Sequence, residues 1–138
     1  MIGIVVVTHG RLGEALVDTA AIIFNESPEA VAKVSIDLSQ DINKLRQKIQ
    51  EGIKQVNHNN GIIMLTAMFG GTPSNLSYSF LEEGRIEVLS GVNLPILIKA
   101  VNLRNRGTDL HEIAKTIEAY GKKSISLASD ILKGNKRE

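Results

Sequence analysis

The sequence contains no cysteine, no long apolar run and no marked excess of charge of either sign. Without cysteine, a disulfide scaffold, a cysteine-ligated zinc site and thiol catalysis are excluded. No apolar stretch approaches the ~20 residues that a membrane-spanning helix requires, and the basic flank and cleavage site of a secretory signal are missing. The formal net charge of +1 gives no sign of the basic surface that nucleic-acid binding requires. We therefore expect a cytoplasmic protein that does not bind nucleic acid.

What the sequence does contain is a regular alternation of apolar runs and helical patterns. Its 138 residues match the usual size of one domain, and 43% of them are hydrophobic. Strands are expected at residues 2–7, 30–36, 61–66 and 86–89, and helices at about 12–24, 42–56, 73–83 and 95–104 and after residue 109. This alternation predicts an α/β fold in which helices cover both faces of a parallel sheet. Residues 1–132 are expected to form the single domain and 133–138 a disordered tail.

Helix starts can be assigned from hydroxyl and carboxylate side chains that precede the periodic segments. Ser39 or Asp41 is expected to cap the second helix, and Thr108 or Asp109 the last one. Thr72, which Pro73 follows, is expected to cap the third.

His9 stands where the first apolar strand runs into a glycine-containing turn. In an open α/β sheet, ligands bind in the crevice beyond the carboxyl ends of the strands. Imidazole is the side chain whose charge changes near neutral pH, which suits it to nucleophilic or proton-transfer work. The position therefore makes His9 a candidate catalytic residue, although most lone histidines are structural and the strand end alone favours that role.

A second glycine-rich turn follows the third strand, in the segment MFGGTPSN (residues 68–75). Gly70 and Gly71 permit backbone conformations and close approaches that a Cβ atom would prevent. Backbone N–H groups at the start of the next helix suit an anion such as phosphate. A tight strand-to-helix turn without a ligand is the alternative, and nothing resembles a Walker loop or a GxGxxG motif.

Together, three ordered motifs resemble the enzyme IIA component of the mannose-type sugar phosphotransferase system. They are IVVVTHGRLGEAL at the N-terminus, MFGGTPSN about 60 residues later, and LSGVNLPIL after the fourth strand. The resemblance covers nearly the whole chain. It implies a doubly wound, mainly parallel four-stranded sheet in the order 2-1-3-4. It also implies a C-terminal antiparallel edge strand, matched by residues 124–127, that is exchanged across a homodimer.

The resemblance further implies that His9 accepts a phosphoryl group from the carrier HPr and passes it to a IIB component. The IIB component in turn phosphorylates sugar that enters through the membrane components IIC and IID. In this reading Gly10, Arg11, Gly70, Gly71 and Thr72 hold or position the phosphate, and neither a cofactor nor a metal is required. For Arg11 the alternative is a solvated surface arginine, which is the more usual role. The residues agree with such a relay, because a neutral imidazole can attack phosphorus in line when positioning and charge stabilisation are supplied.

Ala67 departs from the family's pattern, which has an aspartate at this position. That aspartate would accept a hydrogen bond from the imidazole and fix its tautomer and orientation. Alanine provides no acceptor, so Thr8 or Thr66 would have to replace it, or Asp37 from the neighbouring strand.

Three functions therefore stay open. The favoured one is a working IIA protein whose activity Ala67 weakens. The alternatives are a non-catalytic or regulatory relative, and the phosphotransfer subunit of a dihydroxyacetone kinase system. His58 and His111 are expected at the surface, and no pair of side chains has metal-ligand spacing.

Overall fold

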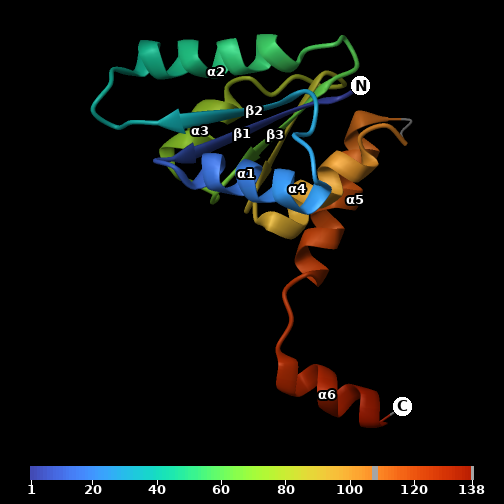
Figure 1. Cartoon of the computed structure of the whole chain (residues 1–138). Coiled ribbons are helices and arrows are strands. Elements are labelled where there is room, and N and C mark those ends of the chain that lie inside the picture. The colour runs from blue at the N-terminus through green and yellow to red at the C-terminus, as the bar shows by residue number, and fades with distance from the viewer. Residues whose placement is uncertain (107–108, 138) are drawn as a thin grey trace.

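The computed structural model describes residues 1–106 and 109–137, and within them it forms four strands and six helices (Figure 1). The strands are β1 (Gly3–His9), β2 (Val31–Ile36), β3 (Ile62–Thr66) and β4 (Ile86–Ser90). The helices are α1 (Leu12–Phe24), α2 (Ile42–Val56), α3 (Thr72–Tyr78), α4 (Leu94–Leu103), α5 (Leu110–Lys123) and α6 (Ala128–Arg137). All strand pairs are parallel and the order is β2-β1-β3-β4, as expected.

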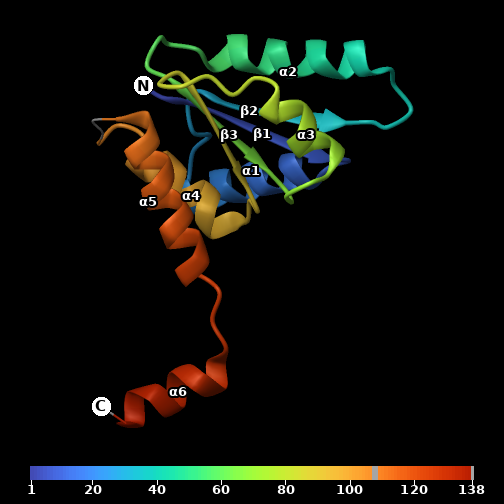
Figure 2. The ribbon, with the colours of Figure 1, turned by 180° about the vertical axis from the view of Figure 1, so that it is seen from behind.

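Alternate residues of the central strands belong to two separate hydrophobic cores, one on each face of the sheet. On one face, Ile4 and Val6 pack with residues of α1, α4 and α5. On the other face, Val5 and Val7 pack with residues of α2 and α3. The two layers of helices can be followed in Figures 1 and 2. Because both faces of β1 and β3 are covered, these strands consist of continuous apolar runs.

The helix starts agree with the sequence in part. Asp41 is the N-cap of α2, and its carboxylate accepts hydrogen bonds from the backbone of Asn43 and Lys44. The expectation for α3 is wrong, because the N-cap is Gly71 and Thr72 is already inside the helix. Asp109 precedes α5 without a side-chain cap bond, and Thr108 lies outside the described residues.

The C-terminal part of the chain differs most from the expectation. Residues 125–127 form no strand, and the chain leads away from the sheet into α6 (Figure 1). A strand requires a neighbouring strand for its hydrogen bonds, and this segment has none within the described part of the single chain. The helix α6 reaches Arg137, through most of the segment for which the sequence predicts disorder. Across the described residues, no helix has both the length and the apolar character needed to cross a membrane.

Candidate functional site

At the carboxyl edge of the sheet, His9 lies beyond the last residue of the neighbouring strand β3. Val7 pairs with Thr66, the last residue of β3, whereas His9 pairs with Ile36 at the end of β2. The β1 strand therefore extends two residues further than β3. His9 is partly exposed at this edge, in contrast to the buried residues that precede it. Its side chain is thus available at the crevice where ligands of open α/β sheets bind.

The glycine-rich turn after β3 lies against the imidazole. A Cβ atom placed on Gly71 would stand 3.4 Å from Cε1 of His9. Gly70, with a φ of +89°, adopts the left-handed conformation that glycine tolerates best. The two segments that the sequence singles out, about 60 residues apart, are therefore in contact.

Thr8 lies on the opposite side of the sheet from His9. Its Oγ1 accepts a hydrogen bond of 2.8 Å from the backbone N–H of Gly13, in the first turn of α1. Successive side chains of a strand point to opposite faces, so Thr8 shares a face with Val6 and α1 while His9 shares one with Val7. Thr8 fixes the start of α1 and is not in a position to orient the imidazole.

Thr66 shares a face with His9 but is occupied by a hydroxyl network. Its Oγ1 lies 2.6 Å from Oγ of Ser74 and 2.9 Å from Oγ of Ser90. Ser74 also donates to the carbonyl of Met68, and Ser90 bonds to the hydroxyl of Tyr78 at 2.8 Å. Thr66 and Ser74 are almost completely buried. This network links the turn beside His9 to the ends of β3 and β4. No pattern in the sequence predicts it.

Ala67 begins the turn between Thr66 and Met68 and carries no polar side-chain atom. Within residues 1–106 and 109–137, the side-chain hydrogen bonds include none to the imidazole of His9. Asp37 does not take the place of the missing aspartate, because its Oδ1 accepts bonds from the N–H and the hydroxyl of Ser39. These bonds, and more weakly the charge of Lys48, lower the pKa of Asp37 below its ordinary value.

A cleft of about 780 Å³ opens beside His9 between the ends of β1 and β2. Its wall contains Arg11, Glu14, Asp37 and Lys48. Arg11 is 91% exposed and forms an ion pair with Glu14 at 3.3 Å, which agrees with a solvated surface arginine. Lys48 is held more firmly, because its Nζ donates to the carbonyl of Ser35 at 3.1 Å. Lys48 and Glu14 were not among the predicted site residues, since ordinary charged positions on helices give no signal in the sequence.

Large apolar side chains surround the mouth of the site. Leu38 is 65% exposed on the β2 side, and Met68 and Phe69 are 59% and 81% exposed on the turn that contacts His9. Exposed apolar side chains that gather around a polar centre are typical of a surface that another protein covers.

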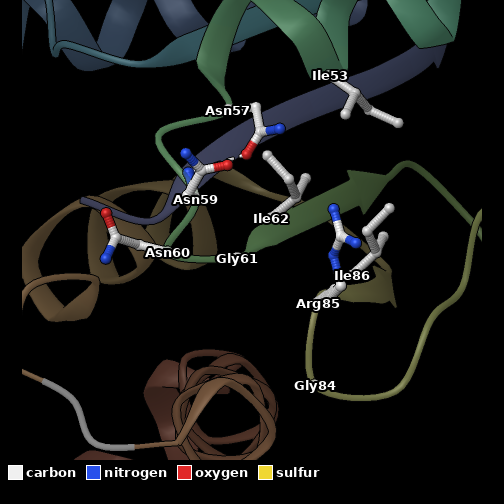
Figure 3. A pocket seen from close by; sticks show the side chains of 9 residues that line it. All are labelled: Ile53, Asn57, Asn59, Asn60, Gly61, Ile62, Gly84, Arg85 and Ile86. Atoms are coloured by element: carbon white, nitrogen blue, oxygen red, sulfur yellow. Dashed lines mark hydrogen bonds between the residues drawn. The ribbon is translucent and has the colours of Figure 1, made fainter.

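A second hollow, of about 440 Å³, lies at the opposite, amino-terminal edge of the sheet (Figure 3). Its walls carry Asn57, Asn59 and Arg85. The carboxyl edge is where ligands of this fold class bind, and His9 lies there. The candidate site is therefore the cleft at His9.

Comparisons with known proteins agree on one family. A family model described as PTS system fructose IIA component matches residues 3–118. Over 133 residues, the chain is 30% identical to the PTS system fructose-specific EIIA component of Bacillus subtilis (strain 168), covering 96% of this chain and 90% of that protein. It is 26% identical to the PTS system mannose-specific EIIAB component of Escherichia coli (strain K12), over 90% of this chain but 38% of that protein. The crystal structure of phosphotransferase system component EIIA from Streptococcus agalactiae has a TM-score of 0.83 at 26% identity, covering 94% of this chain and 99% of that one.

Proposed function

Since the chain belongs to the family of PTS system fructose IIA components, we propose that it carries a phosphoryl group on His9. The donor is phospho-HPr and the acceptor is a IIB component. The observation that supports the proposal most is the contact between His9 and the turn at Gly71, at the carboxyl edge of the sheet. In this proposal the IIB component passes the phosphoryl group to sugar that enters through the IIC and IID components. The relay between HPr and IIB takes place in the cytoplasm.

The proposed transfer consists of two displacements at phosphorus. A neutral imidazole nitrogen of His9 attacks the phosphoryl group in line, so that a new N–P bond forms while the N–P bond of the donor histidine breaks. In the second step a nucleophilic side chain of the IIB component attacks the same phosphorus in line, so that a bond from IIB to phosphorus forms while the N–P bond of His9 breaks and its imidazole returns to the neutral form. Little covalent assistance is required, because positioning and charge stabilisation carry most of phosphoryl transfer.

In this proposal the turns on both sides of His9 hold the phosphate oxygens. Gly10 adopts a left-handed φ of +53° directly after His9, which turns the chain toward Arg11 and α1. From the other side comes the turn of Gly70, Gly71 and Thr72, in which Gly71 is the residue that lies beside the imidazole. Backbone N–H groups and the Thr72 hydroxyl supply donors there, and Lys48 adds a positive charge to the cleft wall.

Ala67 distinguishes the favoured function from its alternative. Without a carboxylate, the charged phosphoimidazole is stabilised less and the ring is oriented less firmly. We therefore propose a working but weakened relay, and a non-catalytic, regulatory IIA relative is the second candidate. The relatives named above are sugar-system components, which disfavours the dihydroxyacetone kinase subunit.

We also propose that the chain forms a homodimer through residues 124–127. Ile125 and Leu127 are 79% and 64% exposed in the single chain. Strand β4 lies at one edge of the sheet, and none of its residues is fully buried. The N–H and C=O of Ile86 are paired with Glu82, and beyond Ile86 this edge offers unpaired backbone groups to an added strand. A second copy that contributes residues 124–127 would cover this edge.

The phosphoryl relay can be tested by mass spectrometry of the intact protein after incubation with HPr, its kinase and phosphoenolpyruvate. We expect the wild type to gain one phosphate and His9→Ala to gain none. His58→Ala is the matched control, because His58 is exposed in a polar loop, and it should label as the wild type does. Absence of label on the wild type would contradict the relay and favour the regulatory candidate.

A further inference from the structure

Arg104, which follows α4, is a buried cation whose hydrogen bonds are incomplete. It is only 5% exposed. Its Nη1 donates to the carbonyl of Ala30 at 3.3 Å, while its Nε finds no acceptor among the described residues. Burial lowers the pKa of Arg104, and the charge of Glu29 opposes this shift. A buried donor without an acceptor destabilises the folded state, and the described residues give this guanidinium one hydrogen bond in place of the five that it can donate.

Arg104 lines a pocket of about 240 Å³ at the amino-terminal edge of the sheet. Two carboxamides, those of Asn60 and Asn105, belong to the same wall. Figure 3 shows the Asn60 side chain on the side away from Arg85, and Asn60 lines both this pocket and the neighbouring hollow. The wall also contains Met1, whose N-terminal ammonium donates to Oδ1 of Asn60. The polar part of the wall therefore consists of Arg104, the two carboxamides and this ammonium, and each of them can donate hydrogen bonds to an anion.

The first turn of α5 completes the pocket through Leu110 and Ile113. The N-terminus of a helix carries a partial positive charge, and its first N–H groups lack partners inside the helix. The side chain of Asp109 at the N-cap makes no cap hydrogen bond. Asp109 and Glu112 are exposed, so water screens their charges more than that of the buried Arg104. Among the described residues, none of the ion pairs involves Arg104.

We propose that this pocket binds a small oxyanion of the phosphate class, held by Arg104, Asn60 and Asn105. A planar guanidinium matches the oxygens of phosphate, and the volume suits a small anion rather than a nucleotide. The pocket lies at the edge of the sheet opposite His9, so an anion bound there does not occupy the transfer cleft. The site is independent of the proposed relay.

The test is an NMR titration of ¹⁵N-labelled full-length protein with inorganic phosphate, following the Nε–H signal of Arg104. We expect a saturable shift of this signal and of the Leu110 amide. Asn105→Asp, which places a carboxylate in the pocket wall, should weaken binding about tenfold or more through like-charge repulsion. Asn57→Asp is the matched control, because it makes the same charge change in the neighbouring hollow, and its affinity should stay close to that of the wild type.

The same titration on His9→Ala separates this pocket from phosphate bound in the transfer cleft. The Arg104 shift should persist there, whether or not the relay proposal holds. A shift confined to residues around His9, an unsaturable shift, or a shift that Asn105→Asp leaves unchanged would overturn the proposal. Because Asn105 is exposed, this variant avoids the loss of folding that replacement of the buried arginine could cause.

Discussion

Ala67 stands where the family's pattern has an aspartate beside the proposed phosphoryl carrier His9. Neither threonine predicted as a substitute for the family aspartate hydrogen-bonds to His9: Thr8 bonds to Gly13 on the other face, and Thr66 bonds to Ser74 and Ser90. Asp37 accepts its bonds from Ser39. None of these three side chains accepts a hydrogen bond from the imidazole, and the residue that lies beside the ring is Gly71.

Ala67→Asp should accelerate phosphorylation of His9 by HPr. Loss of an orienting carboxylate costs about 10⁴ in turnover in a serine protease, and we expect a smaller gain here, roughly tenfold to a hundredfold, because transfer between histidines needs less proton movement. The measurement is a single-turnover labelling rate. Ala67→Asn is the matched control, since it has a similar shape without charge, and it should gain much less. Equal rates in all three proteins would show that a carboxylate at this position does not matter.

His111 forms a pH-dependent hydrogen bond with Glu87, away from the candidate site. Its Nδ1 lies 3.0 Å from Oε1 of Glu87, and this hydrogen bond and charge raise the pKa of His111 above its ordinary value of 6.5. Because the pKa is raised on folding, the stabilisation is complete below pH 6.5 and is lost as the pH rises through the folded-state value.

Glu87→Gln should therefore lower the pKa of His111 toward 6.5 in an NMR titration. The stability difference between wild type and variant should be larger at mildly acidic than at alkaline pH. Glu14→Gln, which alters a carboxylate on the other side of the molecule near Arg11, serves as the control and should leave the His111 titration unchanged. An unchanged His111 pKa in Glu87→Gln would exclude the contact in solution.

At the scale of elements, the sequence predicts β1 and α1 well because their patterns are local. The apolar run of β1 and the period of α1 belong to their own residues, and α1 spans 12–24 as expected. The start of α3 was assigned wrongly, because a threonine before a proline is a common cap and here stands one position inside the helix. The hydroxyl network depends on contacts between β3, α3 and β4, which no local pattern reveals.

Ser74→Ala should destabilise the turn that contacts His9. The substitution leaves the buried Thr66 hydroxyl and the Met68 carbonyl without this partner, which should lower the free energy of unfolding by about 1–3 kcal/mol. The phosphorylation rate of the folded protein should fall as well, because the turn is held less firmly.

Ser77→Ala is the matched control for this variant. Ser77 is equally buried on α3, but its hydroxyl donates within the same helix, to the carbonyl of Pro73. Urea unfolding and single-turnover labelling of both variants separate the two effects. If Ser77→Ala slowed labelling as much as Ser74→Ala, the network would have no special role in positioning His9.

At the scale of the whole molecule, the strand order could be obtained from the resemblance, and it places β1 beside β3. Because β1 and β3 are neighbours, His9 and Gly71 lie side by side although they are about 60 residues apart in the sequence. The structure of residues 124–127 in a single chain could not be predicted in the same way, because a strand forms there only where a partner edge is present. Its apolar residues and the free edge of β4 leave two surfaces that a second copy would cover.

In solution we therefore expect a particle with twice the chain mass of 15.0 kDa, measured by light scattering after size exclusion. Ile125→Asp and Leu127→Asp should each shift the equilibrium toward monomer by tenfold or more, because burial of such a side chain contributes about 1.5–3 kcal/mol. Neither variant should lower the stability of the monomer, since both side chains are exposed in the single chain. Ser126→Asp is the matched control, because alternate residues of an extended segment point to opposite sides. A wild type that runs as a monomer, or an equal effect of all three substitutions, would show that these residues do not form the dimer contact.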